Sequence, residues 1–218
     1  MSHYYVLDTE TTGLDLPRRA VEVAWLRIDA NFEVLDEFVA RVNPGRPIHP
    51  GAIEIHGITD AMVANCPPIE AVIAGLPKPF VAIGHNVSYD LGVLADHVEY
   101  SADVCTLALS RRYVKGTVNH KLPTLKEALG LSKQESHSAL GDCHTSLELL
   151  RHIAKLIGRN LPEIVELESQ PKILNTMPFG MHRGKAFSSV PRDYREWLLA
   201  QSELHKDIRY TLEKLRIL

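Results

Sequence analysis

Two acidic residues, separated by a single residue, stand where an apolar segment ends near the start of the chain. The segment reads YYVLDTETTGL, so Asp8 and Glu10 directly follow the apolar residues 4–7. Side chains at positions i and i+2 of a strand point to the same side, and we therefore expect both carboxylates to project together. Two adjacent carboxylates repel each other unless a proton or a cation lies between them. Alone, such a pair is more often an ordinary solvated strand end.

Three further residues suit the same chemistry. The motif GHNVSYD places Asp90 in the first turns of an expected helix, and SHSALGD places His137 five residues before Asp142. A helix N-terminus favours an anionic side chain, so Asp142 and a histidine just before the helix can face one cleft. Taken singly, each has a structural explanation, and a lone histidine such as His137 is more often structural. Together with Asp8 and Glu10 they form a candidate site for Mg²⁺ or Mn²⁺, because hard oxygen ligands without a nearby cysteine disfavour Zn²⁺.

The elements that must position these residues are strands and helices in mixed order. The first three expected strands, joined by short turns, form an antiparallel meander, and the Pro- and Gly-rich residues 43–59 are expected to form an ordered loop. The last long helix has an apolar face whose members recur at three- and four-residue steps. The predicted fold class is α/β, a mixed sheet flanked by helices. Strands are expected at 3–10, 20–29, 34–44 and 80–86, and helices at 60–65, 69–76, 88–98, 122–131 and 138–159.

The remaining residues divide into a linker and a tail. Residues 160–176, NLPEIVELESQPKILNT, contain two prolines and no strong period, which predicts a linker. The tail has a Gly-rich start and two expected helices. We therefore expect a domain at 1–159, a linker at 160–176 and a small C-terminal module at 177–218.

Composition excludes several classes. The 218 residues are 45% apolar and 23% charged, as in ordinary globular proteins, and a net charge of −3 argues against coating nucleic acid through bulk charge while leaving room for a local basic groove. The three cysteines lie far apart without a CxxC pair, which disfavours a zinc cluster or a disulfide framework. Neither a signal peptide nor a run of roughly 20 apolar residues is evident, so we expect a cytoplasmic protein without membrane association.

The motifs DTETTG, HNVSYD and HSALGD, in this order, resemble the three exonuclease motifs of the DEDD family in its DEDDh branch. The resemblance covers residue 4 to about residue 157, and all four acids and the histidine have counterparts. It implies an RNase H-like fold and a 3′–5′ exonuclease that hydrolyses phosphodiesters with two Mg²⁺ ions, for which Mn²⁺ can substitute. The implied metal ligands are Asp8, Glu10, Asp90 and Asp142, and the implied general base is His137.

Smaller segments extend the resemblance to the substrate. The turn formed by Thr11, Thr12, Gly13 and Leu14 is where a 3′-terminal nucleotide is implied to lie, and IHGIT contributes His56, Ile58 and Thr59. His85 and Asn86 stand where family members approach the substrate. Each of these has an alternative explanation as a loop or core residue, and Arg18 and Arg19 either contact DNA or are simply solvated.

The tail resembles the C-terminal segment of the exonuclease X-like members of the family, through PFGMHRGKAFSSV and the later YREWLL. Gly180 and Gly184 suggest a tight hairpin that displays His182, Arg183 and Lys185. These residues form either a small basic contact for DNA or phosphate or the solvated surface of a packing module.

The resemblance implies a DNA substrate, either single-stranded or at the 3′ ends of duplexes, in DNA repair or end processing. Alternatives in the same family are an exoribonuclease acting on RNA and a polymerase proofreading subunit. Alternatives of other classes are a non-catalytic nucleic-acid-binding module and a phosphodiesterase for small nucleotides. The strand preference and the oligomeric state, including a homodimer, stay open.

Overall fold

The computed structural model describes residues 3–131, 138–201, 204 and 206–216. The chain forms two units, Met1–Leu167 and Glu168–Leu218. His137, the implied general base, lies outside the described residues.

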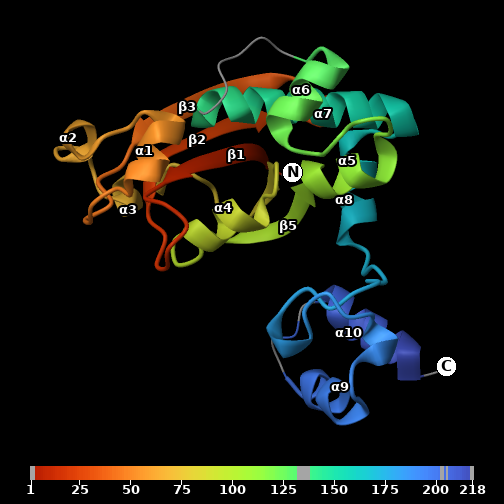
Figure 1. Cartoon of the computed structure of the whole chain (residues 1–218). Coiled ribbons are helices and arrows are strands. Elements are labelled where there is room, and N and C mark those ends of the chain that lie inside the picture. Colours follow the sequence, from red (N-terminus) through yellow and green to blue (C-terminus); the bar gives the residue numbers. More distant parts are fainter. Residues whose placement is uncertain (1–2, 132–137, 202–203, 205, 217–218) are drawn as a thin grey trace. The chain divides into compact units, whose positions relative to one another are not determined.

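The first unit is built on a five-stranded mixed sheet with the order β3-β2-β1-β4-β5 (Figure 1). The strands are β1 (Tyr4–Thr11), β2 (Ala20–Ile28), β3 (Val34–Arg41), β4 (Phe80–Gly84) and β5 (Tyr100–Cys105). The first three form the expected antiparallel meander, whereas β4 runs parallel to both β1 and β5. The predicted α/β class is confirmed, and β1 with its two acids is the central strand.

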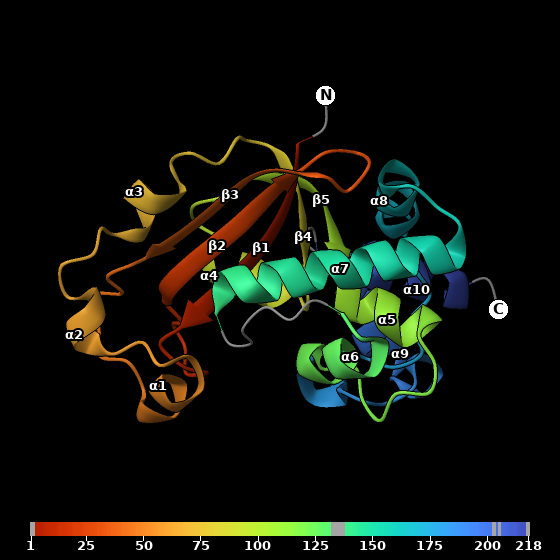
Figure 2. The same cartoon turned by 90° about the horizontal axis from the view of Figure 1, so that it is seen from above.

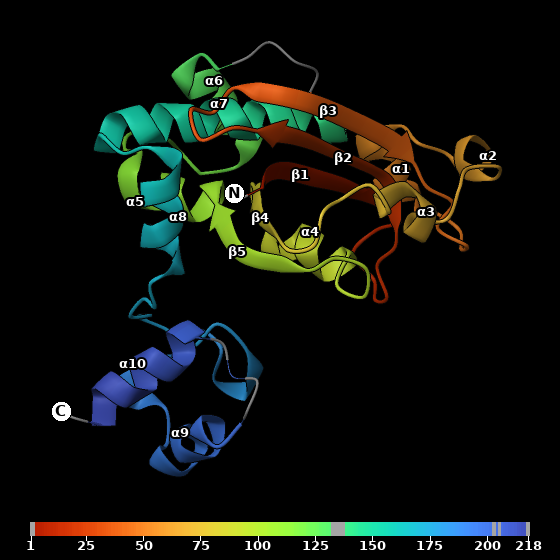
Figure 3. The same ribbon diagram turned by 180° about the vertical axis from the view of Figure 1, so that it is seen from behind.

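Helices cover both faces of this sheet. The helices up to Ser169 are α1 (Pro50–His56), α2 (Asp60–Val63), α3 (Ile69–Ile73), α4 (Ser88–Val93), α5 (Thr106–Tyr113), α6 (Leu122–Leu129), α7 (Ala139–Ile157) and α8 (Leu161–Ser169). Of these, α1 and α2 lie beyond the end of the strands (Figures 1 and 2). Figure 2 shows α7 running across the strands, and Figures 1 and 3 show α4 on the opposite side of the sheet.

Alternation along the strands explains this three-layer arrangement. Val6, Leu26 and Ile83 face a core shared with α5, α6 and α7, whereas the neighbouring Leu7 and Trp25 face a second core shared with α3 and α4. Successive side chains of a strand point to opposite faces, so a strand apolar at nearly every position is buried on both sides. The central strand is therefore held rigidly between two cores.

The structure differs from the expected elements in three segments. Residues 100–113, where the sequence analysis expects no element, form β5 and α5. The loop expected at 43–59 contains α1, which begins at a proline and is capped by His49, whose Nδ1 accepts a hydrogen bond from the Gly51 N–H at 3.0 Å. The segment expected to be a linker contains α8. Its Leu161 and Ile164 are fully buried in the core shared with α7, and Pro162 stands in the first turn, where a missing N–H is tolerated. Tertiary burial, not local periodicity, makes this segment helical.

The second unit has its own small core. It contains the 3-10 turns η1 (Gly180–His182) and η2 (Phe187–Ser189) and the two expected helices, α9 (Arg192–Leu199) and α10 (Lys206–Arg216). The buried residues are Met177, Phe187, Val190, Leu198, Ile208 and Leu212. Its boundary at residue 167 lies inside the segment expected to be a linker.

None of the helices in the described part of the chain has the length and apolarity that a bilayer crossing requires.

Candidate metal centre and nucleic-acid site

Three carboxylates meet at the end of the central strand. Asp8 and Glu10 come from β1 and Asp142 from the first turn of α7, and one ligand oxygen from each lies within 4.8 Å of the others. All three side chains are partly exposed. Three carboxylates this close carry a charge that a cation or protons must offset, and a donor set made only of oxygens fits a hard divalent cation.

Asp90, the fourth predicted acid, is buried beside this group and is fastened to β1 itself. Its Oδ1 accepts hydrogen bonds from the Thr9 N–H at 2.9 Å and from Thr9 Oγ1 at 2.7 Å. Since β1 pairs with β4 only as far as Val6, the Thr9 N–H lies beyond that pairing and finds its acceptor in Asp90. The residue between Asp8 and Glu10 thereby sets the position of the fourth acid.

Gly84 makes the approach of α4 to β1 feasible. A Cβ at this position would lie only 2.9 Å from the Leu7 carbonyl oxygen, which is closer than side-chain carbons tolerate. The absence of a side chain where β4 ends lets the chain turn closely past β1 and lead into α4.

The electrostatics of the acids reflect burial and mutual repulsion. Burial raises the pKa of Glu10 to about 7, and the charges of Asp142, Glu22 and Asp90 act in the same direction. Burial also raises the pKa of Asp90 to about 7, although the hydrogen bonds from Thr9 oppose the change. The pKa of Asp8 lies well above its usual range, first through burial and then through the charges of Asp90 and Asp142. Protons and a cation therefore compete for this site near neutral pH.

Glu22 is a fifth carboxylate here, and sequence reasoning missed it. It lies on β2 directly across from Glu10. Its Oε2 accepts a hydrogen bond at 3.2 Å from the N–H of Ala139, the first residue of α7. The Ser138 hydroxyl caps the same helix end by accepting from the Gly141 N–H at 3.1 Å. Glu22 therefore holds the helix end that carries Asp142. The sequence does show an acid inside the apolar strand AVEVAWL. It does not show that this acid lies opposite Glu10 in the sheet.

A pocket of about 510 Å³ opens beside Glu10. Of the residues implied to bind substrate, Thr11, Gly13, Leu14 and His56 line it. Leu14 and Ile55 are strongly exposed, at 77% and 60%, so the pocket offers apolar side chains to a ligand. Further lining residues that sequence reasoning did not single out are Thr9, Asp15, His49, Gly51, Ala52, Ile55 and Tyr89.

Hydrogen bonds fix the wall of this pocket. His56 Nε2 donates to the Thr11 carbonyl oxygen at 3.2 Å in the tautomer whose Nδ1 accepts from the Ile58 N–H at 3.0 Å. Burial lowers the pKa of His56, which favours this neutral form. The hydroxyls of Tyr89 and Thr11 are 2.8 Å apart. The turn after the acids is therefore preorganised from two sides.

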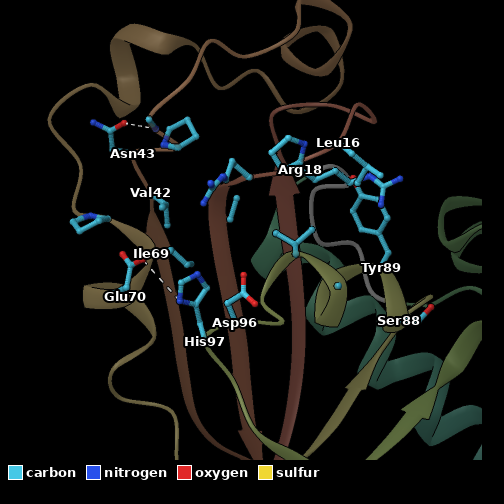
Figure 4. A pocket seen from close by; sticks show the side chains of 18 residues that line it. Leu16, Arg18, Val42, Asn43, Ile69, Glu70, Ser88, Tyr89, Asp96 and His97 are labelled. Atoms are coloured by element: carbon cyan, nitrogen blue, oxygen red, sulfur yellow. Dashed lines mark hydrogen bonds and ion pairs between the residues drawn. The ribbon is translucent and has the colours of Figure 1, made fainter. Parts of the chain in front are cut away.

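Tyr89 lines both this pocket and a second one of about 550 Å³, which is drawn in Figure 4 and is also lined by Arg18. The Arg18 guanidinium lies over the Tyr89 ring, 4.9 Å from its centre, and Arg18 Nε donates to the Leu14 carbonyl oxygen at 3.2 Å. Arg18 and Arg19 both line the second pocket. Farther along the wall of this second pocket, His97 Nδ1 lies 3.9 Å from Glu70 Oε1 (Figure 4).

The other residues implied to bind substrate lie elsewhere. Thr12 and Ile58 are buried, and Thr59 precedes α2 as its N-cap. His85 Nε2 donates to the His120 carbonyl oxygen at 2.9 Å, and burial lowers its pKa to about 4. His85 lines a separate pocket near Leu122. These residues do not line the pocket beside the acids.

Asn86 is exposed, with a left-handed φ of 68° in the turn before α4. In the second unit, Arg183 and Lys185 are exposed on the hairpin and His182 is partly exposed.

Comparison with known proteins identifies the family of this chain. The family model described as Exonuclease matches residues 5–150. Exodeoxyribonuclease 10 of Escherichia coli (strain K12) is 33% identical over 217 residues, which cover 95% of this chain and 96% of that protein. DNA polymerase III PolC-type of Bacillus subtilis (strain 168) is 31% identical over 166 residues, 70% of this chain but 11% of that protein.

A solved structure agrees with the sequence match. Exonuclease X in complex with 5′ overhanging duplex DNA superposes with a TM-score of 0.64 and 32% sequence identity, covering 76% of this chain and 99% of the other. The predicted RNase H-like exonuclease fold is confirmed. The chain belongs to the exonuclease family.

Proposed function

We propose that this protein is a metal-dependent 3′–5′ exodeoxyribonuclease that releases nucleoside 5′-monophosphates from DNA 3′ ends. The observation that carries the proposal is the meeting of Asp8, Glu10 and Asp142 within 4.8 Å beside a pocket of about 510 Å³. A relative that matches nearly the whole chain and is named an exodeoxyribonuclease supports DNA as the substrate.

The acids are the metal ligands in this proposal, and a histidine is the base. Asp8, Glu10 and Asp142 would hold Mg²⁺, with Mn²⁺ as a substitute, and Asp90 would complete the ligand set for two ions. When bound, such ions supply an activated water and stabilise charge on the phosphate. His137 is proposed as the group that accepts the proton of the attacking water, on the strength of the motif HSALGD, since it lies outside the described residues.

The pocket beside Glu10 is proposed to hold the 3′-terminal nucleotide. The exposed apolar side chains of Leu14 and Ile55 offer contact surface for the base and sugar. Arg18, held against Tyr89, is placed to meet a backbone phosphate, and Arg19 lines the same second pocket as Arg18. Thr12, Ile58, Thr59, His85 and Asn86 are proposed to shape the fold around the site rather than to touch the nucleotide.

The substrate class is tested with DNA and RNA oligonucleotides of matched sequence, each labelled at the 3′ end. We expect faster release of label from DNA, and the released product should comigrate with a deoxynucleoside 5′-monophosphate. Faster loss of label from RNA would instead establish the exoribonuclease alternative. Binding of both without any release would establish a non-catalytic binding module.

A matched variant guards this test against a contaminating nuclease. Glu10→Gln removes one carboxylate of the cluster at nearly constant volume, and Glu166→Gln makes the same change on the exposed surface of α8. Release should disappear in the first variant and persist in the second. The cytoplasmic location and a role in DNA repair or end processing stay predictions.

A further inference from the structure

The second unit carries a positive charge that the rest of the chain does not. Residues 168–218 contain nine Lys and Arg against six Asp and Glu, a net charge of +3, whereas the first 167 residues contain fifteen against twenty-one, a net charge of −6. The net negative charge of the first 167 residues repels negatively charged DNA at long range. The small unit has the opposite sign.

Three aromatic rings form a row on this unit. The rings of His182 and Tyr194 meet edge to face with centroids 4.6 Å apart, and the centroids of Tyr194 and Trp197 are 5.4 Å apart. Trp197 is 55% exposed at the end of the row, although tryptophan is among the side chains that gain most from burial. Nearby in sequence, Phe179 and Met181 are 42% and 78% exposed.

Cations border the row on the hairpin. Lys185 Nζ lies 3.4 Å from His182 Nδ1, so the charge and the rings form one continuous surface. The hairpin is closed by the Met177 N–H donating to the Lys185 carbonyl oxygen at 2.9 Å and by the Gly184 N–H donating to the Met177 carbonyl oxygen at 2.8 Å. Arg183, at the hairpin tip, is exposed as well.

The backbone is shaped around this row. Gly180 has a φ of 71°, and a Cβ there would lie 2.9 Å from the Tyr194 hydroxyl oxygen. Glycine therefore lets the hairpin close onto the tyrosine ring. The nearby acids on α9 are Asp193, which is exposed, and Glu196, whose carboxylate contacts Arg192 Nε at 2.8 Å.

We propose that the surface formed by Lys185, Arg183, His182, Tyr194 and Trp197 binds single-stranded DNA. Bases stack first on the exposed Trp197 ring, beside the partly exposed rings of Tyr194 and His182, and phosphates lie against the two cations. Stacking platforms bordered by cations are how proteins hold single strands without sequence preference. The inference deepens the proposed function, because a second contact on the same strand raises the local concentration of the 3′ end for the nuclease domain. An acidic protein would require only the positive charge of this surface. The exposed aromatic ring beside the charge therefore favours single-stranded DNA, which offers both phosphates and bases, as the ligand.

The test uses the two tryptophans of the full-length protein in EDTA, where no hydrolysis occurs. Trp25 is buried and stacked on Phe38 at 4.0 Å between ring centroids, so a change in emission on adding an oligonucleotide reports on Trp197. A 15-nucleotide oligo(dT) should quench this emission. An abasic oligonucleotide of equal length, which has the phosphates without the bases, should quench it far less.

Binding of the labelled oligo(dT), followed by fluorescence anisotropy, ranks the contacts. Trp197→Ala should weaken binding by about 5- to 100-fold, whereas Trp197→Phe, which keeps a ring, should retain most of it. Arg183→Ala and Lys185→Ala should each lower the slope of log affinity against log salt by about 0.7. Lys214→Ala on α10 is the matched control and should change neither quantity, and unchanged circular dichroism shows that each variant is folded.

Each outcome decides one claim. Saturating binding of oligo(dT) with no change in Trp197 emission, or equal binding by Trp197→Ala, would overturn this proposal and leave the proposed function standing. Quenching without any Mg²⁺-dependent hydrolysis would leave this surface standing and remove the proposed function. Equal quenching by the abasic strand would refute base stacking.

Discussion

Glu10→Gln should stabilise the metal-free protein at pH 8 while abolishing its activity. Without a cation, burial and then the charges of Asp142, Glu22 and Asp90 raise the pKa of Glu10 from 4.5 to about 7. A folded-state pKa above the unfolded one means that the folded protein holds its proton longer. Stability is therefore lost as pH rises from about 4.5 to about 7, and the full penalty is present above that range.

The magnitude follows from this interval. At about 1.4 kcal/mol per pH unit, the ionised Glu10 destabilises the folded state by about 3 kcal/mol at pH 8 and by less than about 1 kcal/mol at pH 5. Glutamine keeps the volume and removes the charge. For a unit of this size, a difference of about 3 kcal/mol in the free energy of unfolding between Glu10→Gln and the wild type corresponds to about 6 to 12 °C in Tm at pH 8.

The assay is thermal unfolding in EDTA at pH 5 and pH 8 for the wild type, Glu10→Gln and the exposed control Glu166→Gln. The variant should melt higher than the wild type at pH 8 and nearly with it at pH 5. Adding Mg²⁺ should raise the Tm of the wild type more than that of Glu10→Gln, since the cation binds the folded state. A variant that melts no higher than the wild type at pH 8 in EDTA would refute the claim that burial and the neighbouring acids make the ionised Glu10 unfavourable in the metal-free protein.

Three further predictions concern activity. Asp8→Ala should abolish turnover, and a robustly active variant would remove the metal site from the mechanism. His137→Ala should lower the rate by roughly 10²–10⁴-fold while leaving Mg²⁺ stabilisation in thermal unfolding intact; activity should also rise between pH 5 and 8 as His137 loses its proton, so a flat profile contradicts its role as base. Glu22→Ala removes the acceptor of the Ala139 N–H at the start of α7 and should reduce turnover, whereas Arg41→Ala, which removes only the neighbour 4.0 Å from Glu22, should leave turnover nearly unchanged.

The acids could be predicted from the sequence because strand period and helix position fix their direction locally. Asp8 and Glu10 share a face through the two-residue period, and Asp142 follows from the start of a strongly amphipathic helix. The three motifs in their order along the chain indicate that these acids belong to one site. The structure brings three of them within 4.8 Å of one another.

Residues that act through non-local contacts could not be predicted in this way. Glu22 matters because of its register against Glu10 and its reach to Ala139, 117 positions away. Tyr89 enters the pocket wall through Thr11, 78 positions away. The helix α8 forms because Leu161 and Ile164 find a buried surface on the first unit, and a single sequence does not display such a surface.

The most direct test of the account follows a 5′-labelled single-stranded DNA over time with Mg²⁺ and with EDTA. We expect a ladder of labelled products that shortens one nucleotide at a time from the 3′ end in Mg²⁺, and intact substrate in EDTA. Immediate release of the labelled 5′ nucleotide, or equal degradation in EDTA, would contradict the central claim that Asp8, Glu10, Asp90 and Asp142 form the metal centre of a 3′–5′ exonuclease.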